Sequence, residues 1–233
     1  MRQLLHIPIV HGHAEMGSAR NKVRRAYVDR RGEIAWQKSR QVIAEFWDVI
    51  EKAVDSLHLD YRKARLYQDG LPTCALEEKI VRDLAARGLP NYRILLKLME
   101  RGATLEGTED PDLLRTEYEL IMKAALEHDP EKVGTGFRKR SCSTNKLERD
   151  DDSKQSHHAL GTAQAAAPPE NGPAAQFRDL LDQRDRFIAQ RIDATLRGGE
   201  IGILFLGALH HAVEKLPNGI HVVSLPQMLE GDD

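Results

Sequence analysis

Two short segments near opposite ends of the sequence share one order of residue types: an apolar run that leads into histidines. The first run is followed by His11, His13 and Glu15, and the second by Gly207 and His210. Neutral imidazole and carboxylate groups together can hold a divalent cation, or can act as a general base and its electrostatic partner without one. A glycine in such a segment lets a ligand or metal approach the backbone closely, because it has no Cβ.

The two apolar runs must be neighbouring strands if these side chains are to share one site. Leu4–Val10 and Ile201–Leu206 are both continuous apolar runs, which is typical of buried strands. In an open α/β sheet, ligands bind beyond the carboxyl ends of the strands. Parallel packing of the two runs would bring His13 and His210 to one rim, the edge of the sheet where the strands end. Taken alone, a histidine after a strand is more often a surface or turn residue. The hypothesis therefore depends on the two ends of the chain meeting.

An arginine on the last long helix is the third informative feature. Arg184 lies on the apolar stripe of a helix expected over Phe177–Arg197, between Leu181 and Ile188. A fully buried arginine is rare unless it is paired. Two interpretations stay open. The side chain either snorkels at the edge of the stripe, or reaches the rim to bind a carboxylate or phosphate group or to orient a catalytic acid.

Acidic residues at the rim are less clearly marked. Asp69 follows another expected strand, where it either forms a turn with the glycine after it or reaches the same rim. Asp110 suits the N-cap of a following helix, which leaves Glu109 the freer of the two for another role. Glu15 is the preferred acid, because its spacing keeps it near the first histidine cluster.

The site hypothesis gives each of these residues a role. The expected catalytic residues are His13, Glu15, Arg184 and His210, and the expected cofactor-binding residues are Asp69 and Gly207. The residues that would hold a divalent metal ion are His11, His13 and His210. A histidine near its unperturbed pKa of about 6.5 can take a proton from water at neutral pH, whereas a bound metal lowers the pKa of the water instead.

Hydrophobic periodicity predicts alternating helices and strands between these segments. Apolar residues at helical spacing over Trp36–Leu57 predict a long helix. The Arg-rich stretch Ala19–Gly32 has weak periodicity and could be a loop followed by a short helix. Shorter helices are expected over Glu77–Arg87, Asn91–Arg101, from Pro111 onward and over Ala212–Leu216, and further strands over Lys63–Gln68, Ala103–Gly107 and Ile220–Leu225. This alternation predicts an α/β fold with a mixed, largely parallel sheet flanked by helices.

Composition divides the chain into three parts. Residues 1–129 are expected to form the N-terminal part of a single α/β domain, and residues 175–233 its C-terminal part. Residues 130–174 hold clustered charges and then many alanines, prolines and glycines, which can bury little surface against the entropy of ordering them. We therefore expect a disordered insertion or linker before the last helix–strand unit.

Composition and charge argue against several classes of protein. The chain has 233 residues, 41% of them hydrophobic, and a formal net charge of −2, which is poor support for a nucleic-acid partner. The longest apolar run, Ile201–Leu209, is too short to span a membrane, and no apolar signal segment follows the basic start. Cys74 and Cys142 cannot form a disulfide framework, so we expect reduced thiols and a cytoplasmic protein.

The C-terminal quarter carries a series of motifs. A helix contains Arg184-Asp185, a strand ends in Gly-x-x-His at Gly207 and His210, and a glycine precedes the final strand. This series resembles the closing segment of the TraB/Tiki-type proteins, a superfamily that also includes erythromycin esterases and ChaN-like haem-binding proteins. The family's N-terminal Gly-x-x-His spacing is absent here, and its usual glutamate after the second strand would fall near Asp69. The resemblance implies metal-dependent or histidine-based hydrolysis and, in some members, binding without hydrolysis.

We therefore expect a hydrolase that acts on an ester or peptide bond of a small-molecule or peptide substrate. The sequence contains no P-loop and no dinucleotide-binding Gly-x-Gly-x-x-Gly after a strand, which argues against ATP-driven and dinucleotide-dependent chemistry. It also contains no Gly-x-Ser-x-Gly elbow, the motif that carries the nucleophilic serine of many hydrolases. The first alternative is a non-catalytic metal- or haem-binding protein that uses the same pocket. The second is a structural or partner-binding protein whose residues 130–174 form the interaction element.

Overall fold

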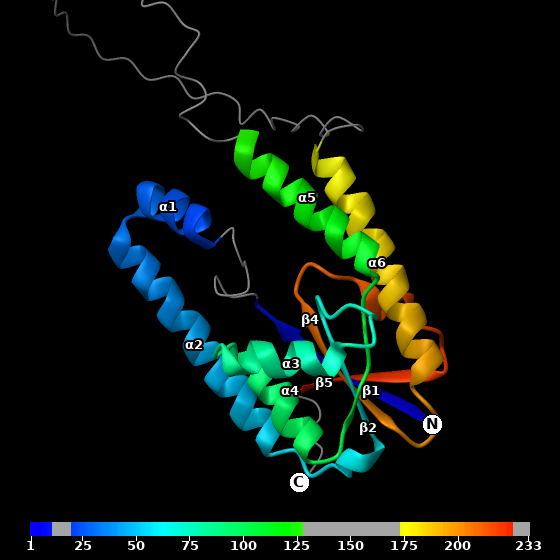
Figure 1. Ribbon diagram of the computed structural model, residues 1–233. Helices are drawn as coiled ribbons and strands as arrows, with labels where there is room; N and C mark the ends of the chain where they lie inside the picture. Colours follow the sequence, from blue (N-terminus) through cyan, green and yellow to red (C-terminus); the bar gives the residue numbers. More distant parts are fainter. Residues whose placement is uncertain (11–19, 128–172, 226–233) are drawn as a thin grey trace, which may run out of the picture.

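A five-stranded sheet forms the centre of the protein, seen here in a computed structural model that describes residues 1–10, 20–127 and 173–225 (Figure 1). All its strands are parallel, in the order β3-β2-β4-β1-β5. The strands are β1 Arg2–Ile9, β2 Ala64–Gln68, β3 Thr104–Leu105, β4 Ile201–Gly207 and β5 Ile220–Ser224. The expected α/β fold is confirmed. The sheet is wholly parallel because each connection between consecutive strands crosses over through helical turns.

Helices cover both faces of this sheet, as Figure 1 shows. The α-helices are α1 Arg20–Arg31, α2 Glu33–Asp55, α3 Glu77–Ala86, α4 Pro90–Glu100, α5 Pro111–Glu127 and α6 Pro173–Thr195. Two short 3₁₀ helices, η2 and η4, span Tyr61–Lys63 and Ala212–Lys215. The helices expected from Glu77, Asn91 and Pro111 are present within one or two residues of the expected bounds.

Successive side chains of each strand point to opposite faces of the sheet, so the hydrophobic core has two layers, one on each face. Leu66 of β2 and Phe205 of β4 pack with apolar side chains of α2, α3 and α4 on one face. Tyr67 of β2 and Leu204 of β4 point to the other face, where they pack with Ile188 and its neighbours on α6. Side chains beyond the carboxyl ends of the strands therefore meet between α6 and the loops that follow β2 and β3.

The first strand joins the two ends of the chain in one sheet. β1 pairs with both β4 and β5, and Ile9, the last residue of β1, lies opposite Gly207, the last residue of β4. The segment that follows Ile9 therefore leaves the sheet beside the segment that leads to His210. This is the neighbouring parallel arrangement that the sequence hypothesis requires.

One segment differs from the sequence expectation, and another lies almost wholly outside the described residues. The Arg-rich stretch forms a regular helix, α1, whose Tyr27 ring packs edge-on against Trp36 of α2 at 5.5 Å. The expected insertion 130–174 lies outside the described residues except for its last two positions.

In the described ranges, no helix combines the length and the apolar character that crossing a bilayer requires.

A glycine in β4 should be intolerant of a side chain. An added Cβ at Gly202 would lie 2.5 Å from Leu4 Cδ1 and 3.2 Å from Tyr67 Cε2, whereas one at Gly198 would meet nothing within 4 Å. Because forced overpacking costs about 1–3 kcal/mol, we expect Gly202→Ala to lower the free energy of unfolding by that amount in urea denaturation. Gly198→Ala is the matched control, with an expected change below about 0.5 kcal/mol. Equal stability of the two variants would contradict this packing.

Candidate functional site

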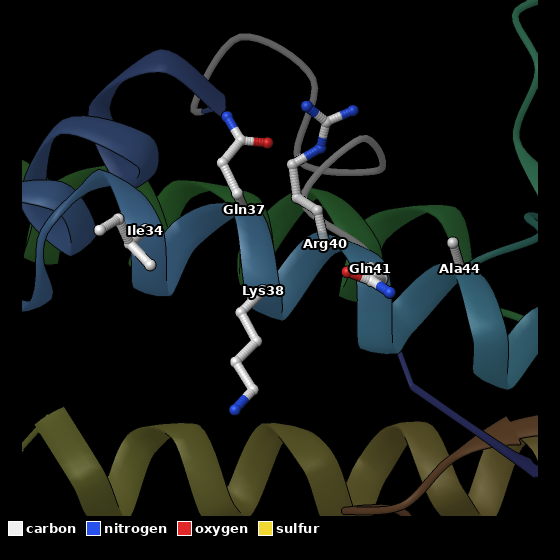
Figure 2. Close-up of a pocket in the computed structure, with 6 residues that line it drawn as sticks. All are labelled: Ile34, Gln37, Lys38, Arg40, Gln41 and Ala44. Atoms are coloured by element: carbon white, nitrogen blue, oxygen red, sulfur yellow. The ribbon is translucent and has the colours of Figure 1, made fainter.

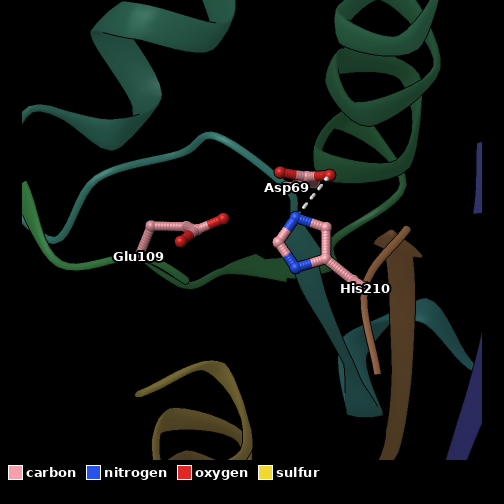
Figure 3. Close-up of side chains that lie close together, drawn as sticks. All are labelled: Asp69, Glu109 and His210. Carbon is pink, nitrogen blue, oxygen red and sulfur yellow. Dashed lines mark ion pairs between the residues drawn. The ribbon is translucent and has the colours of Figure 1, made fainter. Parts of the chain in front are cut away.

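Three polar side chains meet at the carboxyl edge of the sheet, each just beyond a different strand. Asp69 directly follows β2, Glu109 follows β3 and His210 follows β4, and these three strands are neighbours. One ligand-type atom of each residue lies within 4.8 Å of the other two. Figure 3 shows both carboxylate groups turned toward the imidazole of His210. The strand order thus assembles two carboxylates and one imidazole from distant parts of the sequence.

Arg184 of α6 joins the two carboxylates. Its Nε and Nη2 bind the two oxygens of Glu109 at 3.0 and 2.6 Å, and Nη2 also binds Asp69 Oδ1 at 3.0 Å. Nη1 donates to Glu117 of α5 at 2.6 Å. The guanidinium is buried, and although burial alone would lower the pKa of Arg184, its bonds to Glu109 and the nearby acidic charges raise that pKa. Arg184 therefore orients acids, and the snorkelling interpretation is wrong.

The two ring nitrogens of His210 face different carboxylates, one at a short distance and the other at a longer one. Nδ1 is 2.6 Å from Asp185 Oδ1, a short charge-assisted hydrogen bond, whereas Nε2 is 3.4 Å from Asp69 Oδ2. Burial alone would lower the pKa of His210, but the hydrogen bond with Asp185 and the charge of Asp69 outweigh it, so the pKa is raised. Asp185 also accepts the backbone N–H of His211 at 2.9 Å, which fixes the carboxylate itself.

Backbone N–H groups complete the support of the two rim acids. The N–H of Gly207 donates to Asp69 Oδ2 at 2.9 Å, and that of Gly70 donates to Glu109 Oε1 at 3.2 Å. Gly70 has a φ of 77°, a conformation that a residue with Cβ rarely adopts. The two glycines thus hold the carboxylates that face His210.

The site contains more negative than positive charge. Asp69, Glu109 and Asp185 are at most 3% exposed, and they face one guanidinium and one imidazole. Burial raises the pKa of Glu109, and the hydrogen bonds with Arg184 only partly counter this effect. Buried carboxylates in excess of their partners are unfavourable, so protons or a further cation must offset the remaining charge.

The three ligand-type side chains could hold a divalent metal ion. Carboxylate and imidazole groups are the ligands that Zn²⁺ and related divalent ions accept. Two bonds of about 2.1 Å at a tetrahedral angle separate the ligand atoms by about 3.4 Å, and His210 Nε2 and Asp69 Oδ2 are 3.4 Å apart. Haem does not fit, because a porphyrin bound to Nε2 would overlap the Asp69 carboxylate.

The structure brings together four of the residues that the sequence analysis selected. Asp69, Arg184, Gly207 and His210 form one bonded cluster. His11, His13 and Glu15 lie outside the described residues, so their contribution stays a prediction. The predicted metal ligands were His11, His13 and His210, whereas the described group that could hold an ion joins His210 to Asp69 and Glu109.

The predicted site residues did not include Glu109, Asp185 or Glu117. The sequence carries a signal for Asp185, because Leu181, Arg184, Asp185 and Ile188 lie on one face of α6. An acid beside an arginine on an apolar stripe indicates a buried ionic group. The sequence indicates Glu109 only as the acid left free by the capping role of Asp110, and it does not indicate Glu117, because both reach Arg184 across more than 60 residues.

Loss of the guanidinium should destabilise the protein strongly. Arg184→Met keeps the length of the side chain but leaves Asp69 and Glu109 without their counter-charge, so the free energy of unfolding should fall by about 3–5 kcal/mol at neutral pH. Arg186→Met is the matched control on the same helix, since its side chain is 67% exposed and forms an ion pair with Asp182. It should change stability by less than about 1 kcal/mol in the same denaturation experiment. Similar losses in the two variants would show that Arg184 does not stabilise this edge.

Comparison with known proteins returns no family model, no curated protein and no solved structure that matches the chain. The resemblance to the TraB/Tiki-type proteins therefore stays an expectation from the sequence.

Proposed function

We propose that Asp69, Glu109 and His210 bind a divalent metal ion and that the protein uses this centre to hydrolyse a small-molecule or peptide substrate. The observation that carries the proposal is the convergence of the three ligand-type atoms within 4.8 Å at the carboxyl ends of three neighbouring parallel strands. Ligands of open α/β sheets bind at this edge. The excess of buried carboxylates supports a cation rather than an anion as the occupant.

Each side chain has a distinct task in this proposal. Asp185 accepts the Nδ1 proton of His210, so Nε2 presents its lone pair toward Asp69 and Glu109. Arg184 and the N–H groups of two glycines hold the carboxylates in place. Four of the N–H groups of Arg184 already bind acids, so its task is positioning rather than binding an anionic substrate group.

The remaining chemistry concerns water and substrate. When bound, the ion would polarise a water molecule and a carbonyl or phosphoryl oxygen as a Lewis acid. His11, His13 and Glu15 are the predicted further contributors, because β1 ends beside β4 and its continuation begins at the same edge. We expect the substrate to approach over this edge.

A metal-holding protein without catalysis is the second candidate. The observation that favours it is burial: the side chain of His210 is 5% exposed, that of Asp69 3% and that of Glu109 not at all. A fully enclosed ion stabilises a fold, whereas a catalytic ion keeps an open position for water or substrate. Turnover separates these two functions.

Replacement of His210 should abolish metal binding. We expect one equivalent of Zn²⁺ or Mn²⁺ per chain in the wild-type protein after dialysis, measured by elemental analysis, and none in His210→Ala. The matched control is His211→Ala, since the His211 side chain is 63% exposed and contacts Glu214. It should keep both the metal and any hydrolysis of ester and peptide substrates by the wild type.

Each result of this experiment bears on one part of the proposal. A wild-type protein that retains no metal, or a His210→Ala protein that retains it fully, would overturn the metal centre. Stoichiometric metal without hydrolysis of any ester or peptide substrate would leave the centre intact and favour the non-catalytic candidate.

Asp185 should tune metal affinity without being a ligand. The charge of Asp185 orients His210 and makes the imidazole a stronger metal ligand. Because Asp185→Asn removes this charge, we expect the dissociation constant for Zn²⁺ to rise about 10- to 100-fold. Asp182→Asn, one turn earlier on α6 and bonded to Lys215 and Arg186, is the control and should leave the affinity unchanged. Competition with a chromophoric chelator measures both constants. An unchanged constant in Asp185→Asn would show that Asp185 does not support the metal site.

A further inference from the structure

One segment of the chain carries a clear excess of positive over negative charge. Residues 20–44, here called the basic arm, contain eight basic and two acidic residues. The other 208 residues contain 26 basic and 34 acidic residues. The net charge of −2 over the whole chain therefore hides a strongly basic segment in an otherwise acidic protein.

The basic arm is a helical hairpin with exposed cations. It consists of α1 and the first half of α2, which join at Gly32 and pack through Tyr27 and Trp36 at the end of α2 far from the sheet (Figure 1). Among the described residues, no acidic group forms a salt bridge with Arg25, Arg30 or Arg31, and all three are exposed. Exposed arginines on one short helix produce a local positive potential that attracts polyanions.

A groove runs along the second helix of the arm. It has a volume of about 710 Å³ and is lined by Ile34, Gln37, Lys38, Arg40, Gln41 and Ala44. Gln37, Arg40 and Gln41 are three and four residues apart on α2, and in Figure 2 Gln37 and Arg40 project to the same side of the helix. Gln37 and Gln41 each donate a side-chain N–H to an acid of the same helix, Glu33 and Glu45, which fixes their amide groups. Amide groups can bind base edges, and the guanidinium of Arg40 beside them can bind a phosphate, whereas Lys38 projects to the other side of the helix (Figure 2).

We propose that the basic arm binds a single-stranded nucleic acid, with phosphates on the exposed arginines of α1 and bases along the groove of α2. Arginine dominates the cations of the arm, and its planar fork matches phosphate oxygens. The groove has the size of a small-ligand pocket, so it accommodates nucleotides of one strand rather than a duplex. This binding is independent of the proposed metal centre.

The packing of α1 argues against an anionic membrane as the partner. A helix that lies on a bilayer inserts an apolar face between the lipids. The apolar side of α1 is already used, because Tyr27 contacts Trp36, which is 3% exposed. The side of α1 that remains for a partner is formed largely by charged residues.

Neutral substitution of three exposed arginines tests the proposal. The probe is a fluorescein-labelled single-stranded DNA of about 12 nucleotides, followed by anisotropy between about 50 and 200 mM NaCl. We expect the full-length protein to bind it and the variant Arg25→Gln/Arg30→Gln/Arg31→Gln to bind on the order of tenfold more weakly. The slope of log affinity against log salt should become shallower by about 2, since each lost phosphate contact contributes about 0.7.

A matched variant removes the same charge elsewhere. Lys79→Gln/Arg82→Gln/Arg186→Gln neutralises three exposed cations of α3 and α6, each paired with an acid of its own helix, and should bind DNA as the wild type does. Thermal denaturation of both triple variants checks that they fold. His210→Ala should also bind DNA normally, so this test stays separate from that of the metal centre.

Three results would overturn the proposal. The first is no binding of the oligonucleotide by the wild type at the lowest salt concentration. The second is equal weakening in the two triple variants, which would indicate a response to net charge alone. The third is binding of poly-glutamate or of phosphatidylserine vesicles as tight as that of the oligonucleotide at equal salt, which would identify an acidic protein or a membrane as the partner.

Discussion

The bidentate ion pair of Arg184 with Glu109, shared with Asp69, is the interaction on which the carboxyl edge of the sheet depends. Asp69 continues from β2, Glu109 belongs to the loop after β3, and Arg184 comes from α6. The backbone N–H of Gly207 at the end of β4 binds the same Asp69 carboxylate. One guanidinium therefore connects three structural elements whose side chains would otherwise repel one another, and it leaves His210 facing carboxylates of fixed orientation.

These ion pairs are compatible with a cation at the same carboxylates. A carboxylate has about four acceptor positions, and the guanidinium and the backbone N–H groups use only part of them at Asp69 and Glu109. Arg184 thus lowers the cost of burying the acids without neutralising the whole cluster. The same balance would relate stability to binding of the proposed ion, because the charge that is costly to bury is the charge that would attract a cation.

The sequence predicted those parts of the fold and the site that depend on local pattern. β4 and β1 were recognisable as continuous apolar runs, and their neighbouring parallel packing follows from the preference of such strands for a buried sheet. Asp69, Gly207 and His210 were found because each lies at or shortly after the end of a strand. Glu109 was not selected, because its role depends on β3, a strand of only two residues, and on Arg184, which is 75 residues away. Contacts of this kind are set by tertiary packing and leave no periodic signal.

The position of α5 beside α6 has a consequence for the evolution of the chain. Glu117 of α5 bonds Arg184 of α6, and the end of α5 and the start of α6 lie at the same end of this helix pair (Figure 1). The 45 residues between Glu127 and Pro173 thus depart from and return to one place on the surface. Because the entropic cost of closing a loop grows only slowly with its length, homologous chains can lengthen, shorten or exchange this connection. The fold offers a point where new sequence can be acquired without disturbing the polar cluster at the carboxyl edge of the sheet.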